Sequence, residues 1–344
     1  MRCQVPVLFL VFNRPQHTRV SLERIRMAQP AKLYIHCDAA RPDHPGDAEK
    51  VAEVRALIQE KVDWACEVKT LYRTENQGLR AGVGGALNWF FDLEPYGIVL
   101  EDDCVPDPTF FPFCGELLEY YLHDEQIMHI GCSNLAEEYT REGGDSYVFS
   151  RFSFVWGWAG WRRAWKKMSI DLEGLDEFEQ SGMIGNLIKN RGAQIYMMDK
   201  FGVTQRRENQ SWAYAWFYSI LKNNGLCIVP SVNLVQNVGV GESGATHTTK
   251  QNKKAQLEAR SIRFPLKHPA NRDPNPQLEQ RFFHLSQKSR FRLWGWLIRR
   301  RLMTLMTFNE LHHIRPRSHL LGESSTGLHT GNDRNRSVPD QSFR

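Results

Sequence analysis

A short apolar run that ends in three acidic residues constrains the fold of this chain more than any other stretch. Gly97–Leu100 is apolar and β-branched at two positions, and Glu101, Asp102 and Asp103 follow it directly. This composition predicts the end of a buried strand. In a parallel α/β sheet, buried strands end at the crevice where ligands bind.

Three adjacent carboxylates at such a position repel one another, so they favour a partner that neutralises them. Carboxylate oxygens are preferred ligands of hard divalent cations, which often bridge to substrate phosphates. Asp102 and Asp103 are therefore candidate ligands of Mn²⁺ or Mg²⁺. The alternative interpretation is a solvated acidic turn.

The residues before the acidic run alternate between strand-like and helix-like patterns. Apolar runs predict three further strands, at Val5–Phe12, Leu33–Cys37 and Val68–Tyr72. Helical patterns predict the intervening helices, at His17–Met27, Glu49–Lys61 and Val83–Asp92. This alternation predicts an α/β fold of the Rossmann-like type, with a mostly parallel sheet flanked by helices.

Polar residues follow these strands and are expected at the same edge of the sheet. Arg14 could pair with a phosphate through two hydrogen bonds, and Asp38 could accept one from a base or ribose. Gly78 lies in a loop at 73–82, where glycine lets the backbone approach a phosphate. Each feature alone fits ordinary turn chemistry, but together with the acidic run they favour a nucleotide site.

Aromatic residues are densest at Val155–Trp165, which contains four tryptophans. Tryptophan faces stack on sugar rings, and Gly157 lets a ligand approach the backbone between Trp156 and Trp158. The alternative is the start of a core helix. Another tryptophan, Trp212, belongs to a predicted helix at 208–220.

Cysteine usage favours a reducing compartment, and we expect a cytoplasmic protein. The seven cysteines lack paired spacing, and no apolar run approaches the roughly eighteen residues that a membrane-spanning helix requires. A glycine-rich stretch at 237–248 contains His247, a candidate metal or phosphate ligand.

Charge is distributed unevenly along the chain. From Arg260 onward there are sixteen Lys or Arg against six Asp or Glu, which suggests an anionic partner, membrane lipid or nucleic acid. Apolar residues at helical spacing in 288–308, interleaved with arginines, favour a helix at a membrane interface over one packed on the body. We expect a catalytic domain at 1–250, a linker and basic amphipathic helix at 251–310, and a disordered tail at 311–344.

The ordered set of motifs resembles GT-A-fold glycosyltransferases. Leu100–Asp103 with Pro106 and Phe110-Phe111 resembles their metal-binding segment, in the form found in bacterial hemolysin-like glycosyltransferases and, by pattern, in N-acetylglucosaminyltransferase I. Four other segments resemble the same group: 12–15, 76–83, 156–162 and 226–247. The resemblance covers roughly residues 5–250.

This resemblance implies a metal-dependent transferase that uses a nucleotide-diphosphate sugar, a UDP-sugar above all. The acceptor would be a glycan or lipid-linked glycan of a bacterial surface polysaccharide, reached from the inner membrane face, and no nucleic acid partner is expected. Asp103 would hold the cation with support from Asp102 and His247. Donor contacts are expected from Asn13, Arg14, Asp38, Asn76, Gly78, Arg80 and Glu101, and acceptor-side contacts from Trp156, Gly157, Trp158 and Trp212.

One departure from the family pattern concerns the general base. The pattern has an aspartate after the first tryptophan of the segment at 212–216, but this chain has Ala213. An inverting transferase needs a base to take the acceptor proton, so Glu208, or more distantly Asp199, is the candidate. Two alternatives stay open: an impaired nucleotide-sugar-binding module, and a sugar-1-phosphate nucleotidyltransferase, although no glycine- and lysine-rich loop follows the first strand.

Overall fold

The computed structural model describes residues 2–140, 144–239 and 257–286, which all belong to one compact unit, Met1–Gln287. The predicted basic helix, the predicted disordered tail and His247 lie outside the described residues. Residues 257–286 belong to the same unit as the sheet.

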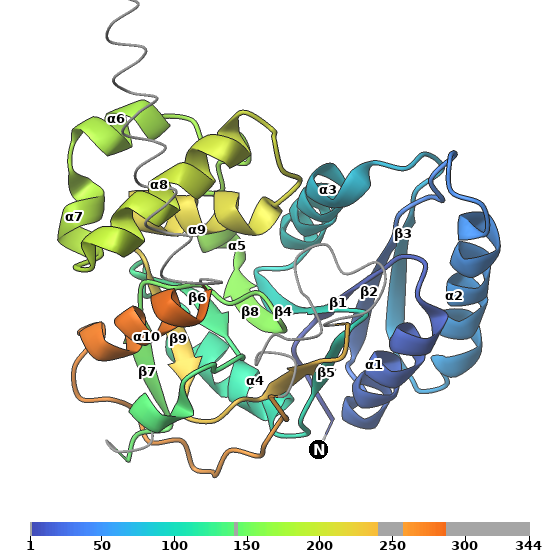
Figure 1. Cartoon of the computed structure of the whole chain (residues 1–344). Helices are drawn as coiled ribbons and strands as arrows, with labels where there is room; N and C mark the ends of the chain where they lie inside the picture. Colours follow the sequence, from blue (N-terminus) through green and yellow to red (C-terminus); the bar gives the residue numbers. More distant parts are fainter. Residues whose placement is uncertain (1, 141–143, 240–256, 287–344) are drawn as a thin grey trace, which may run out of the picture. The chain divides into compact units, whose positions relative to one another are not determined.

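The core of the fold is an eight-stranded sheet with the strand order β3-β2-β1-β4-β8-β6-β9-β7 (Figure 1). β1 to β4 are mutually parallel, and β8 and β7 run antiparallel to their neighbours. The predicted α/β class with a mostly parallel sheet is confirmed. The strands are β1 (Val7–Val11), β2 (Lys32–Cys37), β3 (Glu67–Tyr72), β4 (Tyr96–Glu101), β6 (Ile127–Gly131), β7 (Tyr147–Ser150), β8 (Trp158–Trp161) and β9 (Leu226–Pro230).

Helices cover both faces of this sheet. α1, α2 and α4 contribute to the core cluster on one face, whereas α3, α5 and α9 contribute to the cluster on the other. The helices are α1 (Pro15–Ala28), α2 (Asp47–Lys61), α3 (Gly78–Leu93), α4 (Phe110–Tyr120), α5 (Arg162–Trp165), α6 (Leu175–Gln180), α7 (Met183–Leu187), α8 (Arg191–Gln205), α9 (Trp212–Lys222) and α10 (Pro276–Ser286). None of the helices in the described part of the chain has the length and apolar character needed to cross a membrane.

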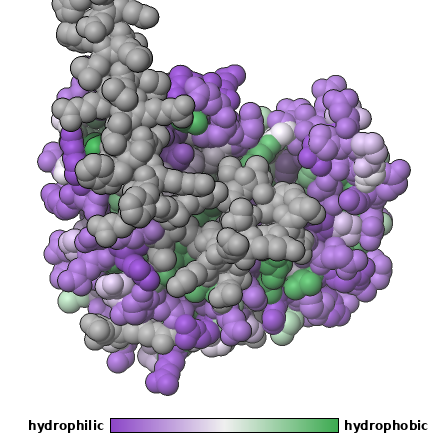
Figure 2. All heavy atoms as spheres, viewed as in Figure 1, coloured by the Kyte–Doolittle hydropathy of each residue, from purple (hydrophilic) through white to green (hydrophobic). Residues whose placement is uncertain are grey.

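β1 shows why the predicted apolar runs form central strands. All five of its residues are buried, and they alternate between the two core clusters: Leu8 and Leu10 face α3, whereas Val7, Phe9 and Val11 face α1. The first strand therefore has no polar side. Outside the core, the described surface in Figure 2 is predominantly hydrophilic.

Two segments differ from the sequence prediction. The second half of the predicted loop at 73–82 is helical, because α3 already begins at Gly78. The tryptophan-rich segment contains a strand, β8, between β4 and β6. Trp158 and Trp161 belong to opposite core clusters, so the segment contributes to both cores rather than starting a single core helix.

A small two-stranded sheet follows the acidic run. β5 (Cys104–Pro106) pairs antiparallel with β10 (Val235–Asn237), and Asn237 lies opposite Cys104. This pairing brings the residues after β10 next to Asp103.

Candidate functional site

The acidic run lies where the strand order reverses direction. The chain passes from β1 to β2 and β3 on one side, and then returns to β4 on the other side of β1. Ligands of open α/β sheets bind at such a switch point, at the carboxyl ends of the strands. Glu101 ends β4 opposite Leu10 of β1, and Asp102 and Asp103 form the turn to β5.

Arg14, directly before α1, joins both aspartates. Its Nη1 lies 3.0 Å from Asp103 Oδ2 and its Nε lies 3.3 Å from Asp102 Oδ2, while Nη2 donates to Asp102 Oδ1. The Arg14 side chain is 33% exposed, compared with 3% for Asp102 and 12% for Asp103. The predicted convergence of the β1 and β4 ends therefore occurs, and it pairs one guanidinium with both aspartates of the acidic run.

The acids have more negative charge than Arg14 neutralises. Burial raises the pKa of Glu101, and the charges of Asp103 and Asp102 raise it further. Burial also raises the pKa of Asp102, although Arg14 partly offsets this increase. Additional positive charge beside these carboxylates would therefore stabilise their ionised forms.

Asp103 has a second set of contacts from β10. Its Oδ1 accepts a hydrogen bond from Asn237 Nδ2 at 3.2 Å, and its main-chain oxygen accepts one from Val238 N at 2.9 Å. A β-carbon at Gly239 would overlap Asp103 Oδ2 and would lie 2.9 Å from Arg14 Nη1. The close approach of this strand end therefore requires glycine. Sequence reasoning missed Asn237 and Gly239 as site residues, although the glycine-rich stretch that contains them was a usable signal.

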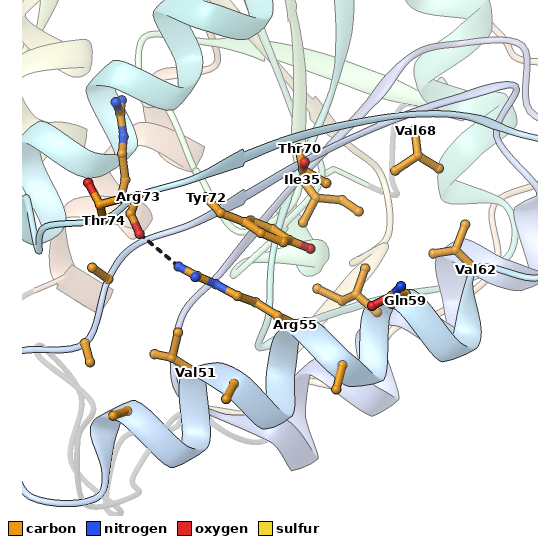
Figure 3. A pocket seen from close by; sticks show the side chains of 16 residues that line it. Ile35, Val51, Arg55, Gln59, Val62, Val68, Thr70, Tyr72, Arg73 and Thr74 are labelled. Atoms are coloured by element: carbon orange, nitrogen blue, oxygen red, sulfur yellow. Dashed lines mark hydrogen bonds between the residues drawn. The ribbon is translucent and has the colours of Figure 1, made fainter.

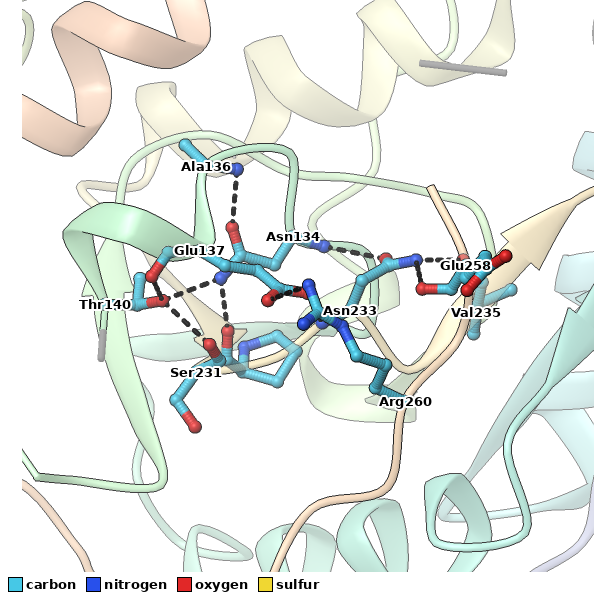
Figure 4. Close-up of polar contacts among 10 residues, drawn as sticks. Asn134, Ala136, Glu137, Thr140, Ser231, Asn233, Val235, Glu258 and Arg260 are labelled. Atoms are coloured by element: carbon cyan, nitrogen blue, oxygen red, sulfur yellow. Dashed lines mark hydrogen bonds and ion pairs between the residues drawn. The ribbon is translucent and has the colours of Figure 1, made fainter. Parts of the chain in front are cut away.

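A buried polar network holds β10 in this position (Figure 4). Glu137 accepts a hydrogen bond from Asn233 N at 2.8 Å and pairs with Arg260. The Asn233 side chain donates to the main-chain oxygens of Val235, at 2.9 Å, and Glu258, at 3.1 Å. The segments on both sides of residues 240–256 are thus joined to the body of the fold.

The two carboxylates Asp102 and Asp103 fit a cation that takes most of its ligands from substrate phosphates and water. Among residues 2–140, 144–239 and 257–286, no group of three or more His, Cys, Asp or Glu side chains could hold a metal by itself. The protein offers Asp103, with Asp102 beside it. One or two carboxylates, completed by substrate phosphates and water, is the usual arrangement for Mg²⁺.

Other predicted donor-site residues have contacts that shape the edge of the sheet. Asp38 accepts main-chain hydrogen bonds from Gln77 and Gly78, both as close as 3.0 Å, so it caps the start of α3. Asn76 donates to Ala39 O at 2.6 Å, and Asn13 donates to Asp47 at 2.7 Å. These residues position the loops around the switch point.

Arg80 lies away from this edge. Its buried guanidinium donates to Thr204 O at 2.9 Å, to Ile170 O, and to Asp171 at 2.9 Å. These contacts join α3 to α8 and to the segment after α5, so the structure does not bring Arg80 to the acidic group as the sequence predicted.

The glycines of α3 serve different purposes. A β-carbon at Gly82 would lie 3.3 Å from Asp38 Oδ2, and one at Gly85 would lie 2.9 Å from Arg73 Nη2, so both allow close approach to side chains of the sheet. Gly78 has a φ of +71° and open space around its missing β-carbon. Gly78 is therefore the glycine still suited to the predicted phosphate contact.

The aromatic residues predicted to contact substrate mostly lie in the core. Trp158 is 1% exposed and Trp212 is 3% exposed, and their ring centroids lie 6.2 Å apart. Their faces contact other protein rings, so neither presents a face for a sugar. Trp156 is half-buried, and it remains the candidate for stacking. Gly157 has a φ of +58°, and its missing β-carbon would lie 2.8 Å from Val235.

The candidate base positions lie in α8, in the first turn of α9 and in the segment between these helices. Glu208 is exposed and pairs with Arg206 at 2.6 Å, and this hydrogen bond lowers the pKa of Glu208. Ala213, in the first turn of α9, packs against the core cluster that contains Trp158 and Trp212. Asp199 is half-buried within α8.

A separate groove of about 950 Å³ lies between α2 and β3 (Figure 3). It is mostly apolar, and Arg55 crosses it beneath the Tyr72 ring, donating to Arg73 O at 3.0 Å. None of the acidic residues lines it, so the groove is distinct from the switch point.

Comparisons with known proteins find distant structural similarities. No family model and no curated protein matches the chain. The mannosyltransferase PcManGT from Pyrobaculum calidifontis, in complex with GDP-Man and Mn²⁺, is 12% identical with a TM-score of 0.33, and the match covers 46% of this chain and 44% of that one. Mouse xyloside xylosyltransferase 1 is 13% identical with a TM-score of 0.35, covering 63% and 81%. A cytidylyltransferase from Leptospira borgpetersenii is 12% identical with a TM-score of 0.30, covering 48% and 64%. The chain thus spans less than two thirds of the mannosyltransferase and of the cytidylyltransferase.

Proposed function

We propose that this chain is a metal-dependent glycosyltransferase whose donor is a nucleotide-diphosphate sugar, a UDP-sugar above all. One observation supports it most: the Arg14 guanidinium and three acids converge at the switch point of a mostly parallel sheet. An acidic site of this kind suits a divalent cation together with a diphosphate.

The residues of the site would divide the work of binding. Asp103, supported by Asp102, would hold Mn²⁺ or Mg²⁺, which when bound neutralises charge on the diphosphate leaving group. Arg14 would contact a phosphate, Gly78 would let the phosphate approach the backbone, and Glu101 would orient the ribose or a neighbouring ligand. The contacts of Arg14 with both aspartates support the roles proposed for these three residues.

The chemistry proposed is inverting transfer of a hexosyl or N-acetylhexosaminyl group to a glycan or lipid-linked acceptor in surface polysaccharide synthesis. Glu208 is the proposed general base, and its exposed carboxylate is free to approach an acceptor once released from Arg206. Glu208→Gln should lower turnover by roughly 10²–10⁴ with nearly unchanged UDP affinity. An unaffected rate eliminates Glu208, and a faster Ala213→Asp variant would show that position 213 faces the acceptor.

We also propose that the protein lies peripherally on the inner membrane face, because basic residues are interleaved with apolar residues in 288–308. Full-length protein should sediment with anionic liposomes at low salt and detach as salt rises. If Arg299, Arg300 and Arg301 are replaced by Gln without reducing sedimentation, the membrane interpretation fails.

A second candidate function is nucleotide-sugar binding without transfer, which Ala213 favours. Incubation with Mn²⁺ and a panel of UDP- and GDP-sugars, followed by measurement of released nucleotide, separates the candidates. Release of nucleotide that disappears in Asp103→Asn supports a transferase, whereas binding of a nucleotide sugar without release of nucleotide supports a nucleotide-sugar-binding module. Pyrophosphate formed from a nucleoside triphosphate and a sugar-1-phosphate would instead identify a nucleotidyltransferase.

A further inference from the structure

We propose that Arg14 competes with the divalent cation for Asp103, and that a diphosphate relieves this competition by taking over the guanidinium. Cation and nucleotide would then bind cooperatively rather than independently. This inference rests on the proposed function, because it assumes that a cation and a diphosphate share the site.

Both carboxylate oxygens of Asp103 already accept hydrogen bonds. Oδ2 accepts from Arg14 Nη1 at 3.0 Å, and Oδ1 accepts from Asn237 Nδ2 at 3.2 Å. Both oxygens of Asp102 are also occupied, in this case by Arg14 alone, through Nε and Nη2. The same guanidinium therefore lies across both candidate metal ligands.

A cation bound at Asp103 would lie close to this guanidinium. Metal–oxygen distances are about 2.1 Å for Mg²⁺, so a cation on Oδ2 would lie no more than about 5 Å from Arg14 Nη1. Arginine cannot lose its proton to relieve the repulsion, and charges at this distance interact strongly where burial lowers the effective dielectric constant.

The guanidinium has room to change partner while its backbone stays in place. The main-chain oxygen of Arg14 accepts hydrogen bonds from Thr18 N at 3.0 Å and Thr18 Oγ1 at 2.9 Å, which hold it at the start of α1. The side chain is one-third exposed, far more than either aspartate. A diphosphate arriving from solvent would therefore meet Arg14 before it meets the carboxylates.

Mn²⁺ binding, measured from the electron paramagnetic resonance signal of the free ion, tests this exchange. Wild type should bind Mn²⁺ weakly alone and at least about tenfold more tightly with UDP, with a reciprocal effect of Mn²⁺ on UDP affinity. Arg14→Gln should bind Mn²⁺ alone about tenfold more tightly than wild type and lose most of the effect of UDP. Arg19→Gln is the matched control, because Arg19 is exposed on α1, the helix that Arg14 precedes, and it should behave as wild type.

One outcome would overturn the inference while leaving the proposed function intact: Arg14→Gln binds Mn²⁺ alone no more tightly than wild type, although wild type binds Mn²⁺ more tightly with UDP than without it. A second outcome needs no variant. If wild type binds Mn²⁺ equally well with and without UDP although UDP itself binds, UDP binding does not depend on Mn²⁺ either, because the coupling is reciprocal, and the inference fails together with the metal-dependent function. If wild type does not bind UDP in the presence of Mn²⁺, the proposed function fails, and the inference fails with it.

Discussion

Removing the Glu137 side chain should loosen β10, the strand that ends at Asn237 and leads to Gly239. Glu137 is 8% exposed in its side chain, and it accepts from Asn233 N at 2.8 Å while pairing with Arg260. In Glu137→Ala the main-chain N–H of Asn233 loses this acceptor. Hydrogen bonds to charged groups contribute about 1.5–3 kcal/mol each, and a buried donor without an acceptor costs about 1–3 kcal/mol.

The ion pair itself contributes less, because the Arg260 side chain is 53% exposed, and such pairs are worth about 0–1 kcal/mol. We therefore expect a loss of about 3 kcal/mol in the free energy of unfolding for Glu137→Ala. At about 2–4 °C per kcal/mol for a domain of this size, the melting temperature should fall by roughly 6–12 °C. Arg260→Ala should cost no more than about 1 kcal/mol, and Glu137→Gln, which keeps an acceptor for Asn233, should fall between the two.

Thermal and urea unfolding of the three variants measure these differences, and titration with UDP and Mn²⁺ reports on the site. Glu137→Ala should also weaken Mn²⁺-dependent UDP binding at temperatures where the protein is folded, because β10 carries the residues beside Asp103. Equal destabilisation by Arg260→Ala and Glu137→Ala would contradict this expectation, since the exposed ion pair would then account for the whole stabilising effect of Glu137. Unchanged UDP binding would refute the link between this network and the site.

Two further predictions follow from the described contacts. Gly239→Ala should weaken Mn²⁺-dependent UDP binding at least about tenfold, because its β-carbon would overlap Asp103. Gly84→Ala is the control, since its β-carbon would meet only Ile170, at 3.7 Å. Equal effects of the two substitutions would contradict the assignment of Gly239 to the site. His36 and His129 should contribute less stability as the pH decreases from about 6.5 to 4, because burial lowers the pKa of each to about 4, so that only the unfolded chain takes up these protons in that range. The raised pKa values of Glu101 and Asp102 act in the opposite direction, so the test is a comparison of variants. The melting temperature of His129→Gln relative to wild type should rise as the pH decreases over this range, and a constant difference would show that His129 does not contribute.

The strands of the fold could be predicted where burial on both faces leaves a continuous apolar run, as in β1 and β4. β8 could not, because its alternation of tryptophan with small residues is also compatible with a ligand-stacking segment or a helix. Its place in the sheet depends on pairing with β4 and β6, which are separated from it in sequence.

For the candidate site, too, contacts at the shared ends of parallel strands could be predicted, whereas contacts with distant segments could not. The contact of Arg14 with Asp102 and Asp103 could be predicted, since both groups follow parallel strands that end at one edge. Arg80 and Trp158 could not be assigned, because their surroundings come from distant segments. Arg80 donates to Thr204, and Trp158 packs among the rings of α9, and no local pattern identifies such partners.

Isothermal titration of the full chain with UDP, with and without Mn²⁺, tests whether the acidic group binds a metal together with a nucleotide. We expect UDP binding that requires Mn²⁺ in wild type and loses this requirement, together with most of its affinity, in Asp103→Asn. Asp107→Asn is a suitable control, because Asp107 follows β5 and accepts hydrogen bonds from Thr109 and Ser261 rather than from Arg14. UDP binding that is absent, or that is equally strong without Mn²⁺ and in Asp103→Asn, would contradict the assignment of the acidic group as a metal and nucleotide site.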